Sequence, residues 1–360
     1  MLTPGRYFIS GNIAVAEAAL LAGCRFYSGY PITPSSEIME HMAARMEKEG
    51  GVFIQTEDEI SAIAAAIGAG MTGTKAMTAT SGPGFSLMQE NIGYAAMTET
   101  PVVIVDVMRG GPSTGQVTIV AQGDVMQARF GSHGDYENIV LAANSVQELV
   151  DLTIKAFNLS VIFRNPVILL SDAELARMIE KVEIPKDIEV YDFNQIKIPD
   201  VPEFKPLGNG HKLAITGLTH DERGYPITTD VNVHRKLVTR LVNKIKNNES
   251  MISDVEIINP DAKNIIVSYG ISSRAAYPVL KKRKDVGLFR PRTLWPFPES
   301  KAKDVFEDKN IITVEMNLRG YDLEVERVAR KYGSKNFKHL KLIGGEVPTP
   351  KHILDALEVN

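Results

Sequence analysis

Residues 29–37 read GYPITPSSE and follow directly on the apolar run CRFYS at residues 24–28. Pro31 and Pro34 restrict their own backbone angles, and each biases the residue before it towards an extended conformation. A buried strand that runs into so stiff a turn would hold the Thr33 hydroxyl at the strand tip. The stretch therefore predicts a rigid strand-to-helix connection with a polar group at its apex.

A plainer interpretation of the same stretch is a tight turn in which Ser35 or Ser36 caps the following helix. Composition alone favours this interpretation over a functional role for the turn. Loops elsewhere in the chain are needed to decide between the two.

From about residue 11 to 180, short β-rich runs alternate with helical stretches. The runs are CRFYS, GVFIQT, KAMTAT, PVVIVDVM, NIVLAA and PVILLSD. This alternation predicts an α/β fold with a parallel sheet covered by helices on both faces. Asn12 is expected to cap the first helix and Gly23 to close it.

The remaining chain divides into two parts. Residues 183–260 are Pro-rich and polar before the basic stretch VHRKLVTRLVNKIKNN, which predicts an extended linker with one docking helix. From about residue 261 the alternation of strands and helices resumes. We therefore expect a first domain over 1–182, the linker, and a second, smaller α/β domain over 261–360.

Composition limits the classes of function. The 360 residues are 44% hydrophobic and 23% charged with a net charge of −4, which is typical of a globular cytoplasmic protein and favours neither a nucleic-acid nor a membrane partner. Cys24 is the single cysteine, so an intrachain disulfide and a cysteine-ligated iron-sulfur cluster within this sequence are excluded. Any electron carrier must come from a partner.

Three further loops follow predicted strands, where ligands bind in open α/β sheets. In QTEDEISAIAAAIGAG, the acids Glu57, Asp58 and Glu59 enter an alanine-rich helix, where negative charge complements the helix dipole. The small residues after Glu59 predict close packing against another surface. In SGPGFS, Gly82 and Pro83 could cradle a phosphate or make a simple tight turn.

The last of these loops is MRGGPSTGQVT, residues 108–118. Arg109 can present its guanidinium fork to a carboxylate, with backbone amides nearby. A surface arginine before a flexible loop is the alternative. His133 and His220 stand alone without metal-ligand spacing, and the chain has no nucleophile elbow, Walker loop or dinucleotide-binding glycine motif.

Together these stretches resemble a known family. GYPITPSSE, EDEISAIAAAIGA, TSGPGFSLMQE, RGGPSTG, HGDY, RPRTLWPFPE and VEMN occur in the order found in alpha subunits of 2-oxoacid:ferredoxin oxidoreductases. The resemblance implies a pyrimidine-binding thiamine diphosphate domain followed by a transketolase C-terminal-like domain. It also implies oxidative cleavage of a 2-oxo acid to an acyl-CoA and carbon dioxide, with coenzyme A as co-substrate and reduction of ferredoxin.

The resemblance assigns roles to individual residues. Glu59 matches the glutamate that bonds to the pyrimidine of the cofactor, and Glu57 is the fallback. Thr33 and Arg109 match the residues that face the carbonyl and carboxylate of the substrate, and Thr118 matches a position that can face the substrate. The remaining matched cofactor positions are Tyr30, Pro31, Ile32, Gly82 and Pro83.

The resemblance also implies partner chains. The diphosphate of the cofactor is normally held through Mg²⁺ by a GDG motif, and this chain has QGDV and HGDY instead. A beta subunit is therefore expected to carry Mg²⁺, the diphosphate site and an iron-sulfur cluster. Gamma and ferredoxin-like delta subunits are expected as well. A stand-alone transketolase-like enzyme conflicts with the missing motif.

The loop after Arg109 indicates which 2-oxo acid the family member uses. RGGPSTG resembles the 2-oxoglutarate branch, although the apolar run at 119–121 replaces more polar residues, and Arg319 and Gly320 stand where many relatives have Gly-Gln. The expected function is the alpha subunit of a 2-oxoglutarate:ferredoxin oxidoreductase. A branched-chain or aryl 2-oxo acid enzyme of the same family and a non-catalytic assembly subunit are the alternatives.

Overall fold

The computed structural model describes residues 1–358 and is built around a seven-stranded sheet with the strand order β12-β6-β7-β5-β4-β2-β3. Six of the strands, from β6 to β3 in this order, run parallel to their neighbours. Strand β12 at the edge is antiparallel to β6. The predicted parallel sheet is confirmed. Its strands are β2 (Phe26–Gly29), β3 (Val52–Gln55), β4 (Ala76–Thr80), β5 (Val102–Met108), β6 (Ile139–Ala142), β7 (Pro166–Asp172) and β12 (Thr293–Trp295).

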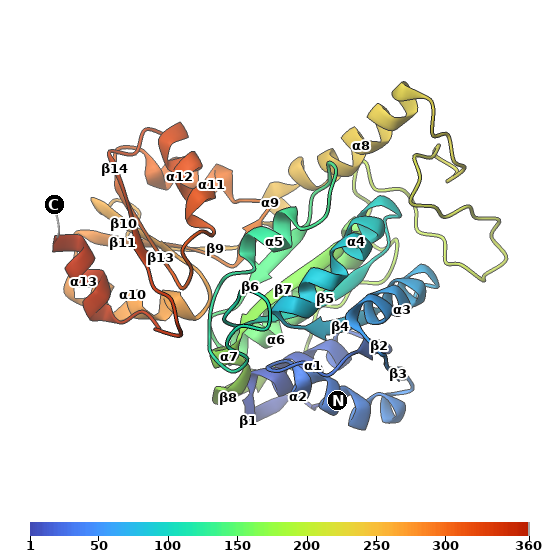
Figure 1. Ribbon diagram of the computed structural model, residues 1–360, viewed down its shortest axis with the longest axis horizontal. Coiled ribbons are helices and arrows are strands. Elements are labelled where there is room, and N and C mark those ends of the chain that lie inside the picture. The colour runs from blue at the N-terminus through green and yellow to red at the C-terminus, as the bar shows by residue number, and fades with distance from the viewer. Residues whose placement is uncertain (359–360) are drawn as a thin grey trace.

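Helices cover both faces of this sheet (Figure 1). Alternate residues of β5 contribute to two different apolar clusters, as a strand buried on both faces requires. One cluster contains side chains of α1, α2 and α6, and the other contains side chains of α3, α4 and α5. The helices are α1 (Gly11–Leu21), α2 (Ser36–Arg45), α3 (Glu59–Met71), α4 (Gly82–Met97), α5 (Val125–Phe130), α6 (Val146–Phe163) and α7 (Ala173–Arg177), with a 3₁₀ turn at Glu47–Glu49.

The prediction that Asn12 caps the first helix is wrong. The capping position is Ser10, and Asn12 is buried within the first turn of α1. Its side-chain amide donates hydrogen bonds to the Pro34 carbonyl at 2.7 Å and to Glu37 Oε2 at 2.8 Å. Asn12 therefore ties α1 to the turn after β2. Gly23 closes the helix as expected, with a left-handed φ of 88°.

A two-stranded antiparallel sheet pairs β1 (Gly5–Ser10) with β8 (Ile179–Ile184). The predicted end of the first domain at residue 182 lies inside β8. After this strand, residues 185–230 form an extended segment without helix or strand. The first part of this segment packs against the first unit, residues 1–184, with Ile198 in its apolar core. In Figure 1 the later part loops out from the first unit and returns to α8 (Val231–Lys246), which lies along the edge of that unit.

Helix α8 is amphipathic, with Leu237, Leu241 and Ile245 buried at helical spacing. Its Arg240 and Lys244 reach the buried Glu99, with nitrogen–oxygen distances of 2.7 and 3.1 Å. The predicted docking helix thus contacts the first unit through both apolar packing and buried ion pairs.

The second sheet has the order β14-β13-β10-β11-β9, with β9 antiparallel at one edge. Its strands are β9 (Val255–Ile258), β10 (Asn264–Ser268), β11 (Val286–Pro291), β13 (Asn310–Glu315) and β14 (Asn336–Lys341). Its helices are α9 (Glu249–Ile252), α10 (Ala276–Lys282), α11 (Glu299–Phe306), α12 (Asp322–Lys331) and α13 (Pro350–Glu358), with a 3₁₀ helix at Gly270–Ala275. Strand β9 therefore lies before residue 261, where the second domain was expected to begin.

The first unit and the second unit, which is built around the second sheet, are joined by direct contacts as well as by the linker. Strand β12 leaves the second unit and pairs with β6 of the first sheet, and Trp295 lies in an apolar cluster that contains residues of both units. In the described range 1–358, no helix combines the length and the apolar composition needed to cross a membrane.

Candidate active site

The turn after β2 brings Thr33 to the carboxyl end of the first sheet. Asn12 holds the neighbouring Pro34 carbonyl, and the hydroxyl of Ser35 donates to the Ile32 carbonyl at 2.9 Å. Ser35 occupies the capping position of α2, but its side chain makes this turn contact in place of a capping bond. Thr33 itself is exposed, so its hydroxyl is free to face a ligand.

Arg109 lies at the end of β5 and contacts the same turn. Its Nη1 donates to the Thr33 carbonyl at 2.6 Å and its Nη2 donates to the Thr114 carbonyl at 3.1 Å. The fold thus joins two predicted substrate residues that lie 76 positions apart. Arg109 is only 6% exposed, so the predicted free fork is partly occupied by backbone carbonyls. A guanidinium has five N–H groups, and three remain for other acceptors.

Glu59 is the first residue of α3, and its side chain is directed inward. Asp58 caps the helix by accepting a hydrogen bond from the Ser61 amide at 2.7 Å. Glu59 is 4% exposed, whereas Glu57 is exposed. Burial raises the pKa of Glu59 above its ordinary value, although Arg109 acts in the opposite direction. The two glutamates therefore differ in environment, and Glu59 has the setting of a carboxyl that can hold a proton.

Gly84 makes room for this buried carboxyl. A Cβ at position 84 would lie 2.1 Å from Glu59 Oε1 and 2.2 Å from Thr80 Oγ1. The Thr80 hydroxyl lies beside the Glu59 carboxyl and lowers its pKa by hydrogen bonding, whereas the buried Ser81 hydroxyl has no hydrogen-bond partner among the described residues. Thr80 at the end of β4 and Gly84 at the start of α4 therefore border the Glu59 carboxyl. Gly82 and Pro83 lie at the half-buried rim of the loop SGPGFS.

The other predicted residues lie at or near the surface of these loops. Thr118 is exposed, and its carbonyl accepts a hydrogen bond from Arg177 at 3.0 Å. Tyr30, Pro31 and Ile32 lie in the same turn as Thr33, and Tyr30 is 39% exposed. These three residues form the outer surface of the turn.

Sequence reasoning did not single out Asp106 and Asp124 as site residues. Asp106 is fully buried in β5, and Asp124 directly precedes α5. Burial raises the pKa of both carboxyls, and that of Asp124 is about 6. The signal in the sequence was a carboxylate inside the otherwise apolar strand PVVIVDVM, since a lone buried charge is costly.

The site fits the aminopyrimidine half of thiamine diphosphate. A carboxyl whose pKa is raised by burial suits a hydrogen bond to a ring nitrogen, and the absence of a side chain at position 84 leaves room for that carboxyl. The four loops that form the site follow β2, β3, β4 and β5, at the carboxyl ends of neighbouring parallel strands.

Comparison with known families agrees with this fit. Residues 17–240 match the family model described as "Pyruvate flavodoxin/ferredoxin oxidoreductase, thiamine diP-bdg", and residues 262–353 match "Pyruvate:ferredoxin oxidoreductase core domain II". The fold and site are thus those of a thiamine-diphosphate-binding α/β protein. More specifically, the chain belongs to the family of 2-oxoacid:ferredoxin oxidoreductases.

Individual relatives support this membership. The chain is 49% identical to "2-oxoglutarate synthase subunit KorA" of Methanothermobacter marburgensis, over 98% of each chain. It is 36% identical to "Ketoisovalerate oxidoreductase subunit VorB" of Methanothermobacter thermautotrophicus, over 97% of this chain and 96% of that one.

Two solved structures are also similar. The 2-oxoglutarate:ferredoxin oxidoreductase of Magnetococcus marinus, with 2-oxoglutarate, coenzyme A and succinyl-CoA bound, superposes with a TM-score of 0.90 at 31% identity. The match covers 98% of this chain and spans 65% of that chain. A split-gene transketolase matches with a TM-score of 0.56 at 12% identity, over 97% of both chains, which is a likeness of fold alone.

Proposed function

We propose that this chain is the alpha subunit of a 2-oxoglutarate:ferredoxin oxidoreductase. In this reaction 2-oxoglutarate and coenzyme A give succinyl-CoA and carbon dioxide, and ferredoxin is reduced. The observation that carries the proposal is 49% identity to a 2-oxoglutarate synthase subunit along 98% of both chains. The buried Glu59 with its raised pKa supports a catalytic role over that of a non-catalytic assembly subunit.

Thiamine diphosphate, when bound, supplies the nucleophilic carbon that attacks the carbonyl of the 2-oxo acid. In the proposed site the Glu59 carboxyl holds a proton at the ring nitrogen of the aminopyrimidine, because its burial favours the protonated form. Arg109 binds the carboxylate next to the carbonyl through its remaining N–H groups. The exposed Thr33 hydroxyl bonds to the same end of the substrate and helps to orient it.

The proposal includes partner chains. A beta subunit is expected to cover the site and to supply Mg²⁺, the diphosphate grip and an iron-sulfur cluster, because this chain lacks a GDG motif and has one cysteine. Gamma and delta subunits, ferredoxin as electron acceptor and a cytoplasmic location belong to the proposal as well. Exposed apolar side chains on β3, α3 and α4, the elements that flank the site, support coverage by another chain; they are Ile54, Ile60 and Leu87.

The test is Glu59→Gln in the complex assembled with its native partners. We expect coenzyme-A-dependent reduction of an artificial acceptor by 2-oxoglutarate to fall about 10²-fold or more, as for loss of a general acid. Glu57→Gln is the matched control, because Glu57 is exposed and lies two residues away. Unchanged activity of Glu59→Gln would contradict the thiamine role of this chain.

Substrate identity needs its own measurement. The wild-type complex is assayed with 2-oxoglutarate, branched-chain 2-oxo acids and aryl pyruvates at equal concentrations. The proposal predicts the highest kcat/KM for 2-oxoglutarate. A higher value for a branched-chain acid would favour the alternative, for which the 36% identical ketoisovalerate subunit is the supporting observation.

A further inference from the structure

Two carboxyl side chains lie next to Arg109 and have no role in the mechanism above. Asp106 is on β5, three residues before Arg109, and its side chain is fully buried. Asp124 is partly exposed, but its Oδ2 atom is buried. Both carboxylate oxygens of Asp106 and the Oδ2 of Asp124 are buried. Among residues 1–358, none of these three oxygens accepts a hydrogen bond from a donor in good geometry.

The two carboxyls are within hydrogen-bonding reach of each other. Two ionised carboxylates at such a distance in a buried place repel strongly, whereas one shared proton turns the repulsion into a hydrogen bond. Burial and the neighbouring carboxyl raise the pKa of Asp106 well above its ordinary value. The pair therefore carries one proton and one negative charge at neutral pH.

Arg109 is the charged group that faces this pair, and its positive charge lowers the pKa of both carboxyls. The Gly82 amide also faces Asp106. Arg109 Nε is buried and has no acceptor in the described part of the chain. The negative charge of the pair thus balances a guanidinium whose backbone contacts are both to neutral carbonyls.

The pair also closes the loop that Arg109 begins. This loop runs from Arg109 to Asp124, and within it the Gly110 amide donates to the Ile119 carbonyl at 2.9 Å. Asp106 lies on the strand before the loop and Asp124 lies at its end. A hydrogen bond between them joins the two ends of this loop.

We propose that Asp106 and Asp124 share one proton and act together as positioning residues that hold Arg109 for the carboxylate of the 2-oxo acid. The inference rests on the proposed function for the identity of the ligand. The shared proton itself depends only on the burial and contact of the two carboxyls.

The test compares variants in the assembled complex with 2-oxoglutarate as substrate. In Asp106→Asn the amide donates to the Asp124 carboxylate and keeps one negative charge, so we expect KM and kcat within about threefold of wild type. Asp106→Ala leaves that carboxylate unpaired, and we expect KM to rise about tenfold or more with a smaller change in kcat. The rescue by asparagine is a result that a purely space-filling role would not require.

The double variant Asp106→Asn/Asp124→Asn keeps the volume of the pair and removes its charge. We expect its KM to rise as in Asp106→Ala. A double variant with wild-type KM would overturn the role of the charge, and an Asp106→Asn variant as impaired as Asp106→Ala would overturn proton sharing. If the alanine variant does not fold, the comparison of single and double asparagine variants still decides.

Infrared spectroscopy of the full chain tests the proton without turnover. Because the buried carboxyls of Glu59 and Glu315 also have raised pKa values, the readout is a difference spectrum at neutral pH. Wild type minus Asp106→Asn is expected to show the C=O stretch of a protonated carboxylic acid, and wild type minus the exposed control Asp304→Asn is expected to show none. Absence of the band contradicts the shared proton whatever the enzyme assay gives. A band together with an active Glu59→Gln complex would instead contradict the proposed function and leave the pair intact.

Discussion

Gly84 shows how a single residue without a side chain shapes the site. We predict that Gly84→Ala displaces the Glu59 carboxyl, since the new Cβ would lie 2.1 Å from Glu59 Oε1 and 2.2 Å from Thr80 Oγ1. Catalytic activity of the assembled complex should fall about 10²-fold, as expected for a misplaced catalytic group. Melting temperature should fall as well because the site is overpacked.

Gly68→Ala in α3 is the matched control for this substitution. Apart from its own helix backbone and its two chain neighbours, a Cβ at Gly68 would meet no described atom within 4 Å, and alanine is more favourable than glycine in a helix by about 1 kcal/mol. We expect unchanged catalytic activity of the assembled complex and an equal or higher melting temperature. Equal activity of Gly84→Ala and wild type would show that the carboxyl position is not critical.

At the residue level, sequence reasoning extends only as far as local spacing and family motifs. The sequence predicts that Glu59 lies at the start of an alanine-rich helix. The structure distinguishes the two glutamates, because Glu59 is buried and Glu57 is exposed. The hydrogen bond from Arg109 to the Thr33 carbonyl could not be predicted from the sequence, because the two residues are 76 positions apart. Only the folded sheet brings the ends of β2 and β5 together.

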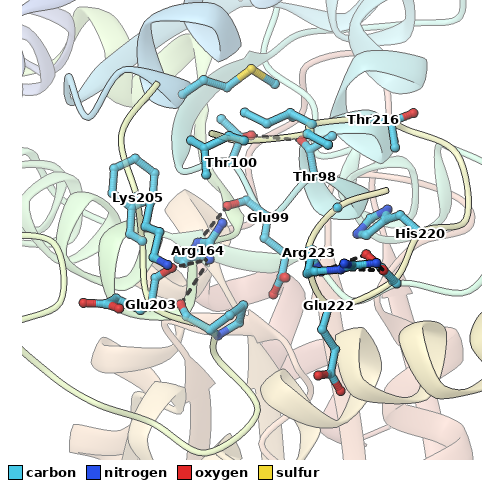
Figure 2. A pocket seen from close by; sticks show the side chains of 18 of the residues that line it. Thr98, Glu99, Thr100, Arg164, Glu203, Lys205, Thr216, His220, Glu222 and Arg223 are labelled. Carbon is cyan, nitrogen blue, oxygen red and sulfur yellow. Dashed lines mark hydrogen bonds and ion pairs between the residues drawn. The ribbon is translucent and has the colours of Figure 1, made fainter. Parts of the chain in front are cut away.

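Among the elements, α8 is connected to the first unit by buried charges. Glu99 accepts from both terminal nitrogens of Arg240, at 2.9 and 2.7 Å, and from Lys244 at 3.1 Å. Figure 2 shows Glu99 beside Arg164 in a cavity of about 880 Å³ between the first unit and the linker. Arg164 also donates to the Pro202 carbonyl at 3.0 Å, so the linker is attached at the same place.

We predict that Glu99→Gln lowers the free energy of unfolding by about 3–5 kcal/mol, because it leaves the buried Lys244 without a countercharge. Chemical denaturation measures the change. Glu222→Gln is the control, since Glu222 pairs with Lys236 on the surface, and we expect no measurable loss. A loss of the same size in both variants would contradict the importance of burial.

The same cluster predicts a pH dependence. Burial opposes ionisation of Glu99, but Lys244 and Arg240 outweigh it and hold its pKa at about 2, below the ordinary value of 4.5. The unfolded chain therefore binds more protons in this range, and the stability from Glu99 is present above pH 4.5 and lost as pH falls towards 2. The free energies of unfolding of wild type and Glu99→Gln, measured at a series of pH values, should converge as the pH falls from 4.5 towards 2. Parallel curves would contradict the lowered pKa.

At the scale of the whole molecule, Gln122 joins the loop after Arg109 to the second unit. Its side-chain amide donates to the Tyr269 carbonyl at 3.2 Å, and its Oε1 accepts from Ser272 Oγ at 2.6 Å and from the Met316 amide at 3.1 Å. Gln122 is fully buried. These hydrogen bonds therefore link the loop from Arg109 to Asp124, called here the substrate loop, to the second unit.

We predict that Gln122→Ala destabilises the contact between the units by about 1–3 kcal/mol, because it leaves buried donors and acceptors unpaired. Hydrogen exchange should become faster at the Met316 amide and in the substrate loop. Gln127→Ala is the control, since Gln127 donates to Ser86 at the surface, and exchange at Met316 should not change. Unaltered exchange in Gln122→Ala would show that the apolar contacts alone hold the units together.

The sequence by itself determined the α/β class, the order of the strands along the chain, the single cysteine and the family motifs. Each of these depends on local periodicity or on residue identity within a few positions. Tertiary structure alone decided that Asn12 binds the turn in place of capping its helix, that β12 crosses to the first sheet, and that Asp106 meets Asp124. These contacts join residues far apart in the chain, and their partners are selected by packing of the whole core, which no local pattern records.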